Sequence, residues 1–314
     1  MAQMHDDHDG HGHSHGHSHA PASFGRAFAI GIGLNLGYVV AEVVFGRLAH
    51  SLALVADAGH NLSDVLGLLL AWGATALATR RPTARRTYGY RRSSILAALT
   101  NAVILLIVIG GILWEAVHRL LAPGPVAGPT VMLVAGGGIL VNGFTALLFA
   151  SGRKGDLNIR GAFLHMAADA GLSLGVVLTG LAILVTGRQW LDPLVSIVLS
   201  FVIVVETWGL LRESINLALD GVPEGIDVAR VQAHLATLPG VIAVHDLHIW
   251  GMSTTEAALT THLVMPERDN HDALLAEAAQ MLHDDFGIEH VTLQIETGDP
   301  AYPCACPLVP AHVG

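Results

Sequence analysis

Six long apolar segments, separated by short polar stretches, make up most of the first two thirds of the chain. Each is long enough to cross the hydrocarbon core of a bilayer as a helix, which needs roughly 20 residues. Glycine recurs inside them, as it does where membrane helices pack closely. The pattern therefore predicts a six-helix transmembrane bundle. The segments cover residues 24–45, 51–78, 95–121, 130–150, 159–186 and 190–211.

Beyond residue 211 the pattern changes to that of a small soluble domain. Two amphipathic helices and three short apolar strands alternate in the order helix, strand, strand, helix, strand. This αββαβ order predicts a small open sheet with both helices on one face, and roughly 80 residues are enough for a small core. The helices are expected over 226–238 and 272–286, and the strands over 241–250, 257–264 and 290–296.

The expected fold class is therefore an α-helical membrane protein with a small α+β domain attached. Its four expected parts are a disordered histidine-rich tail (1–22), the transmembrane bundle (23–211), the αββαβ domain (212–298) and a cysteine-containing tail (299–314).

Composition agrees with membrane insertion. Hydrophobic residues make up 52% of the chain and charged residues 13%, whereas about 25% charged residues are usual in soluble proteins. The formal charge of −10 and the lack of a basic stripe with interleaved aromatics exclude a nucleic-acid-binding protein. The first 20 residues contain no apolar stretch of the kind found in signal peptides. We expect an integral membrane protein that inserts through its own first span.

Basic residues indicate the orientation of the bundle. The stretch 80–92 holds six arginines and the stretch 153–160 holds three basic residues, whereas the intervening loops carry one arginine each. Cytoplasmic loops are enriched in Arg and Lys, so these two stretches and both termini are expected in the cytoplasm. The lack of a long loop or targeting segment favours a bacterial inner (plasma) membrane, and an organelle membrane remains the alternative.

The first 20 residues contain seven histidines, separated mainly by Gly, Ser and Asp. Such a segment cannot bury a core and is expected to be disordered. Imidazoles at near-alternate positions bind borderline metals loosely, so the tail is expected to gather metal ions. A purification tag and a neutral solvated tail are the alternatives.

Two of the apolar segments carry ionisable side chains near their middle, where such groups are costly and rarely idle. His60 and Asp64 are four residues apart in one segment, and His165 and Asp169 repeat the spacing in another. Each pair lies on one helix face, one turn apart. Two nitrogens and two oxygens in tetrahedral array suit zinc, with cobalt or cadmium as competitors. We expect these four side chains to hold one metal ion.

Three further polar residues lie in the first two segments. Asp57 lies one turn from His60. Three roles are open for it: a partner that supports the metal ligands, a proton acceptor, or a residue that packs helices together. Asn35 and Glu42 are seven apart in the first segment, hence on nearly one face, and are expected to orient their neighbours.

The ligands suggest how metal movement is driven. Zinc ligands must be deprotonated, so metal binding releases protons, and a site open to each side in turn exchanges metal for protons. The sequence has no phosphate-binding loop for ATP and no His-Glu-x-x-His helix of a metalloprotease, so we expect no enzyme. A membrane-anchored zinc sensor or buffer without net transport is the alternative.

The chain resembles the cation diffusion facilitators, a family of zinc transporters that exchange metal for protons. The resemblance implies six helices, a cytoplasmic metallochaperone-like domain, homodimerisation, and zinc as substrate and structural ion. The His-Asp pairs are similar to those of the zinc-preferring branch. The resembling stretches are 51–54, 57–60 with Asp64, 88–90, 96–101, His165 with Asp169, 245–250 and 291–296.

The same resemblance places metal ligands in the cytoplasmic domain at His245, His262 and Glu296, with His290 one place from the family's histidine. A zinc cluster at the dimer interface is expected from these residues, and surface histidines are the alternative. His245 and His248 are three apart, so they point to opposite strand faces unless a bulge intervenes.

Two loops depart from the pattern of some family members. The stretch 80–92 has no Asp or His, so the further metal site that some members carry there is not expected. The stretch 151–158 has no His where vesicular members often hold a His-rich loop, and the N-terminal tail is its expected substitute. Cys304 and Cys306 are candidates for a thiolate pair that binds zinc.

Overall fold

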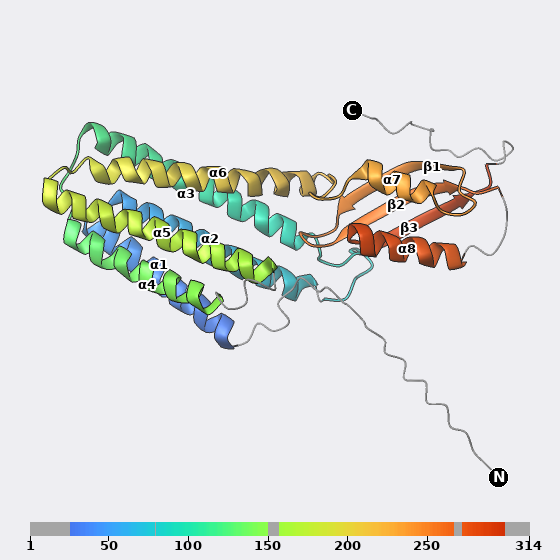
Figure 1. Ribbon diagram of the computed structural model, residues 1–314, viewed down its shortest axis with the longest axis horizontal. Helices are drawn as coiled ribbons and strands as arrows, with labels where there is room; N and C mark the ends of the chain where they lie inside the picture. Colours follow the sequence, from blue (N-terminus) through green and yellow to red (C-terminus); the bar gives the residue numbers. More distant parts are fainter. Residues whose placement is uncertain (1–25, 79, 150–156, 267–271, 299–314) are drawn as a thin grey trace, which may run out of the picture.

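The computed structural model describes residues 26–78, 80–149, 157–266 and 272–298. The six helices expected from the apolar segments are present in the expected order and form the membrane bundle (Figure 1). In the described residues, three stretches meet the length and hydropathy of a span, Ser93–Leu121, Met166–Thr186 and Leu191–Ala218, and Gly128–Phe144 is a shorter apolar stretch. The helices are α1 (Arg26–Leu48), α2 (Leu52–Ala78), α3 (Ser93–Leu121), α4 (Gly128–Phe149), α5 (Leu157–Thr186) and α6 (Leu191–Ala218).

The membrane bundle buries a shared apolar core. α4 packs along α5 and α3 along α6, while α2 contacts α1, α3, α5 and α6. Side chains such as Leu54, Ile109 and Val176 are fully buried between these helices. Large apolar side chains on the outside, including Leu133 and Phe201, are exposed, which suits a surface that faces lipid. Because α2 contacts four other helices of the bundle, its polar side chains meet several of them.

The start of α2 is fixed by side-chain caps. Ser51 Oγ accepts a hydrogen bond from the Leu54 N–H at 3.2 Å, as an N-cap residue does. Asp192 of α6 accepts from the Ser51 hydroxyl at 2.5 Å and from the Leu52 N–H at 2.6 Å. A carboxylate is favourable at a helix N-terminus because the unpaired N–H groups carry partial positive charge. These contacts tie α2 to α6 two turns before His60.

The C-terminal domain has the expected αββαβ order. Its three-stranded sheet has the order β1-β2-β3, with β1 and β2 antiparallel and β2 and β3 parallel. The parallel pair requires a crossover, which α8 provides. α7 and α8 pack together and share one apolar core with the sheet (Figure 1). The elements are α7 (Val228–Ala236), β1 (Ala243–Gly251), β2 (Ala257–Val264), α8 (Asp272–Phe286) and β3 (Ile288–Glu296).

Local signals in the sequence explain the helix ends of this domain. The Asp227 side chain accepts hydrogen bonds from the Ala229 and Arg230 N–H groups and caps α7. α8 ends at Gly287, whose φ of 66° lies in the left-handed region that glycine adopts readily.

Replacing Leu259 tests the apolar core of the C-terminal domain. It is fully buried on β2 between the sheet and the helices, so Leu259→Ala should lower the free energy of unfolding by about 2–5 kcal/mol through lost burial and a residual cavity. Urea unfolding of the full-length protein, followed by tryptophan fluorescence, measures this, because Trp250 lies on β1. Ile242→Ala is the control and should change little, because Ile242 is exposed. Equal effects of the two variants would contradict this core.

The two parts of the molecule touch near the start of α3. The Arg91 guanidinium donates to Glu256 Oε2 at 3.0 Å, and the Thr254 N–H donates to Ser94 Oγ at 3.1 Å. Glu256 and Thr254 lie in the turn between β1 and β2. The sheet is therefore held against the segment that joins α2 to α3.

Candidate metal centres

The first candidate centre lies between α2 and α5 inside the membrane bundle. His60, Asp64 and Asp169 each offer a ligand atom, and these atoms lie within 4.8 Å of one another. His60 Nε2 is 3.1 Å from Asp169 Oδ1, and these two residues are 6% and 3% exposed. The spacing of four residues places His60 and Asp64 one turn apart on α2, and α5 brings Asp169 to the same point. Three of the four side chains expected at this site are therefore brought together.

The fourth expected ligand, His165, belongs to α5 and precedes Asp169 by one helical turn. Its side chain lies outside the described residues. Its role as a ligand stays a prediction, which the helical spacing supports.

Glu206 of α6 is a neighbour of this centre that the sequence reasoning missed. Its Oε2 atom lies 4.0 Å from His60 Nδ1. The available signal was an acidic residue within the sixth apolar segment, where a charge is costly. The sequence holds no pattern that links Glu206 to His60, because the two residues meet only through the packing of α6 against α2.

Two buried carboxyl groups lie beside the ligands without belonging to the same group. The Asn61 amide donates to Glu42 Oε2 at 2.9 Å, so Glu42 orients the residue that follows His60, consistent with the role expected for it. The Ser173 hydroxyl donates to Asp57 Oδ2 at 3.2 Å. Neither carboxyl group is among the ligand atoms that cluster in the described residues.

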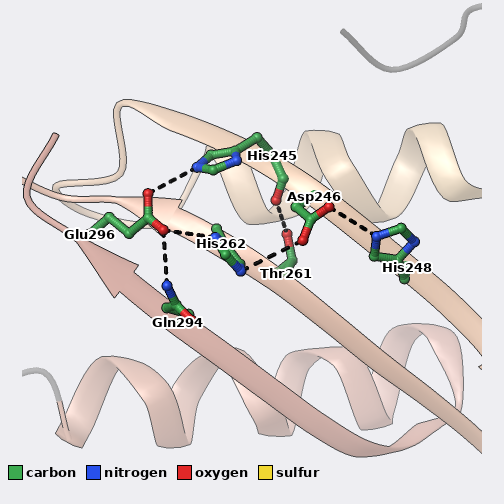
Figure 2. A network of polar contacts seen from close by, with 7 residues as sticks. All are labelled: His245, Asp246, His248, Thr261, His262, Gln294 and Glu296. Atoms are coloured by element: carbon green, nitrogen blue, oxygen red, sulfur yellow. Dashed lines mark hydrogen bonds and ion pairs between the residues drawn. The ribbon is translucent and has the colours of Figure 1, made fainter. Parts of the chain in front are cut away.

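The second candidate centre lies on the sheet of the C-terminal domain (Figure 2). Glu296 at the end of β3 is held between two histidines, with its Oε2 atom 3.2 Å from His245 Nε2 and its Oε1 atom 2.8 Å from His262 Nδ1. The ligand atoms of the three residues lie within 4.8 Å of one another. Strand register explains the meeting, because His245 pairs with His262 across β1 and β2, and Glu296 pairs with Val264 on β2.

A β-bulge decides the direction of the histidines on β1. The register between β1 and β2 shifts between His245 and His248, and Asp246 has a φ of 51°, in the left-handed region that Asp tolerates better than most residues. Simple alternation had left the side of each histidine open. In the structure His245 faces Glu296, while His248 Nε2 lies 3.0 Å from Asp246 Oδ1.

Asp246 is a second residue that the sequence reasoning missed. Its Oδ2 atom lies 3.7 Å from His262 Nε2, on the side of the ring away from Glu296 (Figure 2). A carboxylate in this position can fix the tautomer and orientation of a metal-binding histidine. Its position in a motif with two flanking histidines was visible, but the direction of its side chain depends on the bulge.

His290 corrects one expectation for this centre. It lies opposite Ala258 near the start of β3, and its ring contacts the Tyr88 ring with centroids 5.4 Å apart. Six residues separate it from Glu296, which is roughly 20 Å along a strand. It therefore does not join the group of His245, His262 and Glu296.

The chemistry of the second centre fits zinc. Two imidazole nitrogens and one carboxylate oxygen are ligands that zinc takes in tetrahedral sites, and His245 is 7% exposed. The Nδ1 atom of His245 is buried and accepts or donates no hydrogen bond among the described residues. The candidate thiolates Cys304 and Cys306, and the histidine-rich tail, lie outside the described residues.

Comparison with known proteins covers both parts of the molecule. A model of the cation efflux transmembrane domain matches residues 28–217, and a model of the cation efflux protein cytoplasmic domain matches residues 223–298. The metal cation efflux system protein CzcD of Cupriavidus metallidurans is 39% identical over 260 residues, which is 82% of each chain. The zinc transporter ZitB of Escherichia coli is 39% identical over 263 residues, 83% of each chain.

Two further similarities come from a relative and a solved structure. The cadmium, cobalt and zinc/H(+)-K(+) antiporter of Bacillus subtilis is 35% identical over 267 residues, covering 83% of this chain and 85% of the relative. The metal-bound C-terminal domain of the CzcD transporter from Cupriavidus metallidurans is 43% identical, covering 23% of this chain and 99% of that domain, with a TM-score of 0.22.

Proposed function

This chain belongs to the family of cation efflux proteins, the cation diffusion facilitators, and on that premise we propose that it exports cytoplasmic Zn²⁺ in exchange for protons. It is a transporter and not an enzyme. The convergence of His60, Asp64 and Asp169 between α2 and α5 carries the proposal. A relative named as a zinc transporter, and one named as a zinc/proton–potassium antiporter, support the choice of ion and of exchange.

The ligand set favours zinc as the substrate. Magnesium and manganese prefer oxygen ligands alone, whereas a mixture of imidazole and carboxylate suits zinc. With His165 as the fourth ligand, the site has two nitrogens and two oxygens, the number that a tetrahedral zinc site takes. Cobalt and cadmium are expected to compete for the same site.

The exchange follows from the chemistry of these ligands. Zinc binds the neutral imidazole and the ionised carboxylates, so protons leave the site when zinc enters. When zinc leaves on the far side, the same atoms take up protons. A site that opens to each side in turn therefore moves zinc outward and protons inward without another energy source.

The cytoplasmic domain is proposed to hold a resident zinc ion at His245, His262 and Glu296. The model that matches this domain is named for dimerisation, which supports a homodimer joined through it. An ion that binds only the folded domain stabilises it by mass action. We therefore propose that zinc in the cytoplasm strengthens the dimer and adjusts transport.

The protein spans the membrane and carries its C-terminal domain on the cytoplasmic side. The six arginines of the stretch 80–92, which contacts this domain through Arg91, support the finer proposal that both termini are cytoplasmic and that the membrane is a bacterial inner membrane.

Transport in proteoliposomes tests the proposed function. Vesicles containing the purified protein and a trapped zinc indicator should show Zn²⁺ flux whose direction reverses when the imposed pH gradient is reversed. A protonophore should remove the effect of the gradient, because the protons then equilibrate independently. A zinc sensor or buffer would bind Zn²⁺ and show no flux under either gradient, and that result would exclude an antiporter.

A further inference from the structure

A groove between α1, α2 and α3 belongs to neither metal centre. Its volume is about 630 Å³, within the range of roughly 300–1,000 Å³ of pockets that bind ligands. α1 ends, α2 begins and α3 ends at the end of the bundle opposite the C-terminal domain (Figure 1). Because that domain is cytoplasmic, the groove starts at the far side of the membrane.

The part of the groove farther from these helix ends is apolar. Leu62 of α2 lines it with Val108 and Ile112 of α3, and Val108 is 41% exposed. Val108 precedes Arg119, another lining residue, by three helical turns, which is about 16 Å. Half of the hydrocarbon core of a bilayer is about 15 Å. The apolar lining therefore reaches from the helix ends to about the middle of the bilayer, the depth of one acyl chain.

The mouth of the groove, at the helix ends, is polar. It is lined by Arg47 in the last turn of α1, His50 between α1 and α2, and Arg119 in the last turn of α3. Trp114, which is 69% exposed, lies between Val108 and Arg119 on α3. Tryptophan is enriched at the level of the lipid headgroups, so the mouth lies at that level.

Arg47 supplies the charge that remains unbalanced at the mouth. The Arg119 guanidinium donates to Glu115 Oε1 at 2.9 Å and to the His50 carbonyl at 2.8 Å, so its charge is compensated. Arg47 is exposed, and no carboxylate pairs with it among the described residues. With His50 neutral, two arginines and one glutamate leave one positive charge, which complements the single negative charge of a phosphate diester.

We propose that this groove binds an anionic phospholipid, with one acyl chain between α1, α2 and α3 and the phosphate on Arg47. The surroundings of a transmembrane bundle are lipid, and basic pockets between membrane helices bind lipid headgroups. A zwitterionic phospholipid fits less well. Glu115 is the one carboxylate among the described lining residues, and its pairing with Arg119 leaves no partner for a headgroup ammonium.

The acyl chain packs against the part of α2 that precedes the metal ligands. Ala58 and Gly59 line the groove, and His60 follows them in the chain without lining it. The lipid and the metal ion therefore bind at separate places. The inference depends on the insertion of the bundle in a bilayer and not on the ion that is transported.

Photolabelling of the full-length protein in phosphatidylcholine vesicles tests the proposal. The probe is a phosphatidylglycerol with a photoreactive diazirine near the end of one acyl chain, and peptide mass spectrometry locates the label. It should appear in the segments 55–62 and 108–112, which hold the apolar lining. Unlabelled phosphatidylglycerol should compete about fivefold better than phosphatidylcholine, the effect of one arginine near a membrane surface. Arg47→Gln should remove this preference.

Two matched control variants separate the headgroup from the acyl chain. Arg188→Gln removes an exposed arginine at the same end of the bundle that does not line the groove, and it should keep the preference. Gly111→Phe should block labelling, because Gly111 lines the groove and a Cβ there meets open space. Gly110→Phe is its control, since the neighbouring glycine is equally open but does not line the groove.

Three results would overturn the proposal. Equal labelling of the two segments in Gly111→Phe and Gly110→Phe would show that the lipid does not lie in the groove. An unchanged preference for phosphatidylglycerol in Arg47→Gln would remove the phosphate from Arg47. No label in these segments of the wild type, as expected if a second copy of the chain covers the groove, would exclude a bound lipid. If Gly111→Phe does not fold, the wild type and the two arginine variants decide the matter.

Discussion

Replacing Asp64 by alanine should abolish Zn²⁺ flux in proteoliposomes. Asp64 supplies one of the oxygen ligands that meet His60 and Asp169 within 4.8 Å. Removal of a group that only supports a ligand already costs 10–100-fold in metal affinity, so loss of a ligand should cost at least about 100-fold. Occupancy of the site at micromolar zinc would fall accordingly, and transport with it.

The measurement is the initial rate of zinc entry into vesicles under a fixed pH gradient, normalised to the amount of protein inserted. Glu115→Ala is the control, because this glutamate lies on α3 and pairs with Arg119 rather than with the metal site. Asp169→Asn should fail as Asp64→Ala does, since it replaces the carboxylate beside His60 by a neutral amide, a much weaker zinc ligand. Wild-type rates in Asp64→Ala would mean that zinc crosses the membrane at another site.

Replacing His262 by alanine should remove the stabilisation that zinc gives to the cytoplasmic domain. The His262 ring lies between Glu296 and Asp246, with 2.8 Å from Nδ1 to Glu296 Oε1 and 3.7 Å from Nε2 to Asp246 Oδ2. Zinc at 1,000 times its dissociation constant stabilises a folded protein by about 4 kcal/mol. His262→Ala leaves only His245 and Glu296, which cannot retain the ion at that concentration.

Thermal unfolding with and without zinc measures this loss. The experiment is made in the Asp64→Ala background, so that zinc in the membrane site contributes nothing to the shift in Tm. The parent protein should gain in Tm with rising zinc and lose the gain when a chelator is added. His283→Ala is the control, because His283 is exposed on α8 and pairs with Asp284. An equal zinc-dependent shift in His262→Ala would place the resident ion elsewhere.

The residues of the membrane centre could be predicted from the sequence only in part. His60 and Asp64 belong to one helix, so their spacing alone is enough to place them on one face. The partnership with Asp169 was inferred because the same spacing recurs in another span, and in the structure Asp169 lies 3.1 Å from His60. Glu206 had no such repeat, and only the packing of α6 against α2 brings it to the imidazole.

The cytoplasmic centre depended more on backbone detail. Alternation along a regular strand left the side of His245 undecided, and the bulge at Asp246 turns it toward Glu296. His290 was expected near the same ion because it lies one place from the histidine that the family resemblance implies there. The length of the strand separates them, and its ring contacts Tyr88 instead.

The amino-acid sequence by itself determined the six helices, the αββαβ order and the His60–Asp64 pair, because hydrophobic period, helix caps and one-turn spacing act between residues close together in the chain. The tertiary structure decided which polar side chains meet across helices and strands. Glu42 and Asn61 lie in separate segments of the sequence and became a hydrogen-bonded pair only when α1 packed against α2. Such contacts depend on helix rotation and strand register, which are set by packing of the whole molecule rather than by any local pattern.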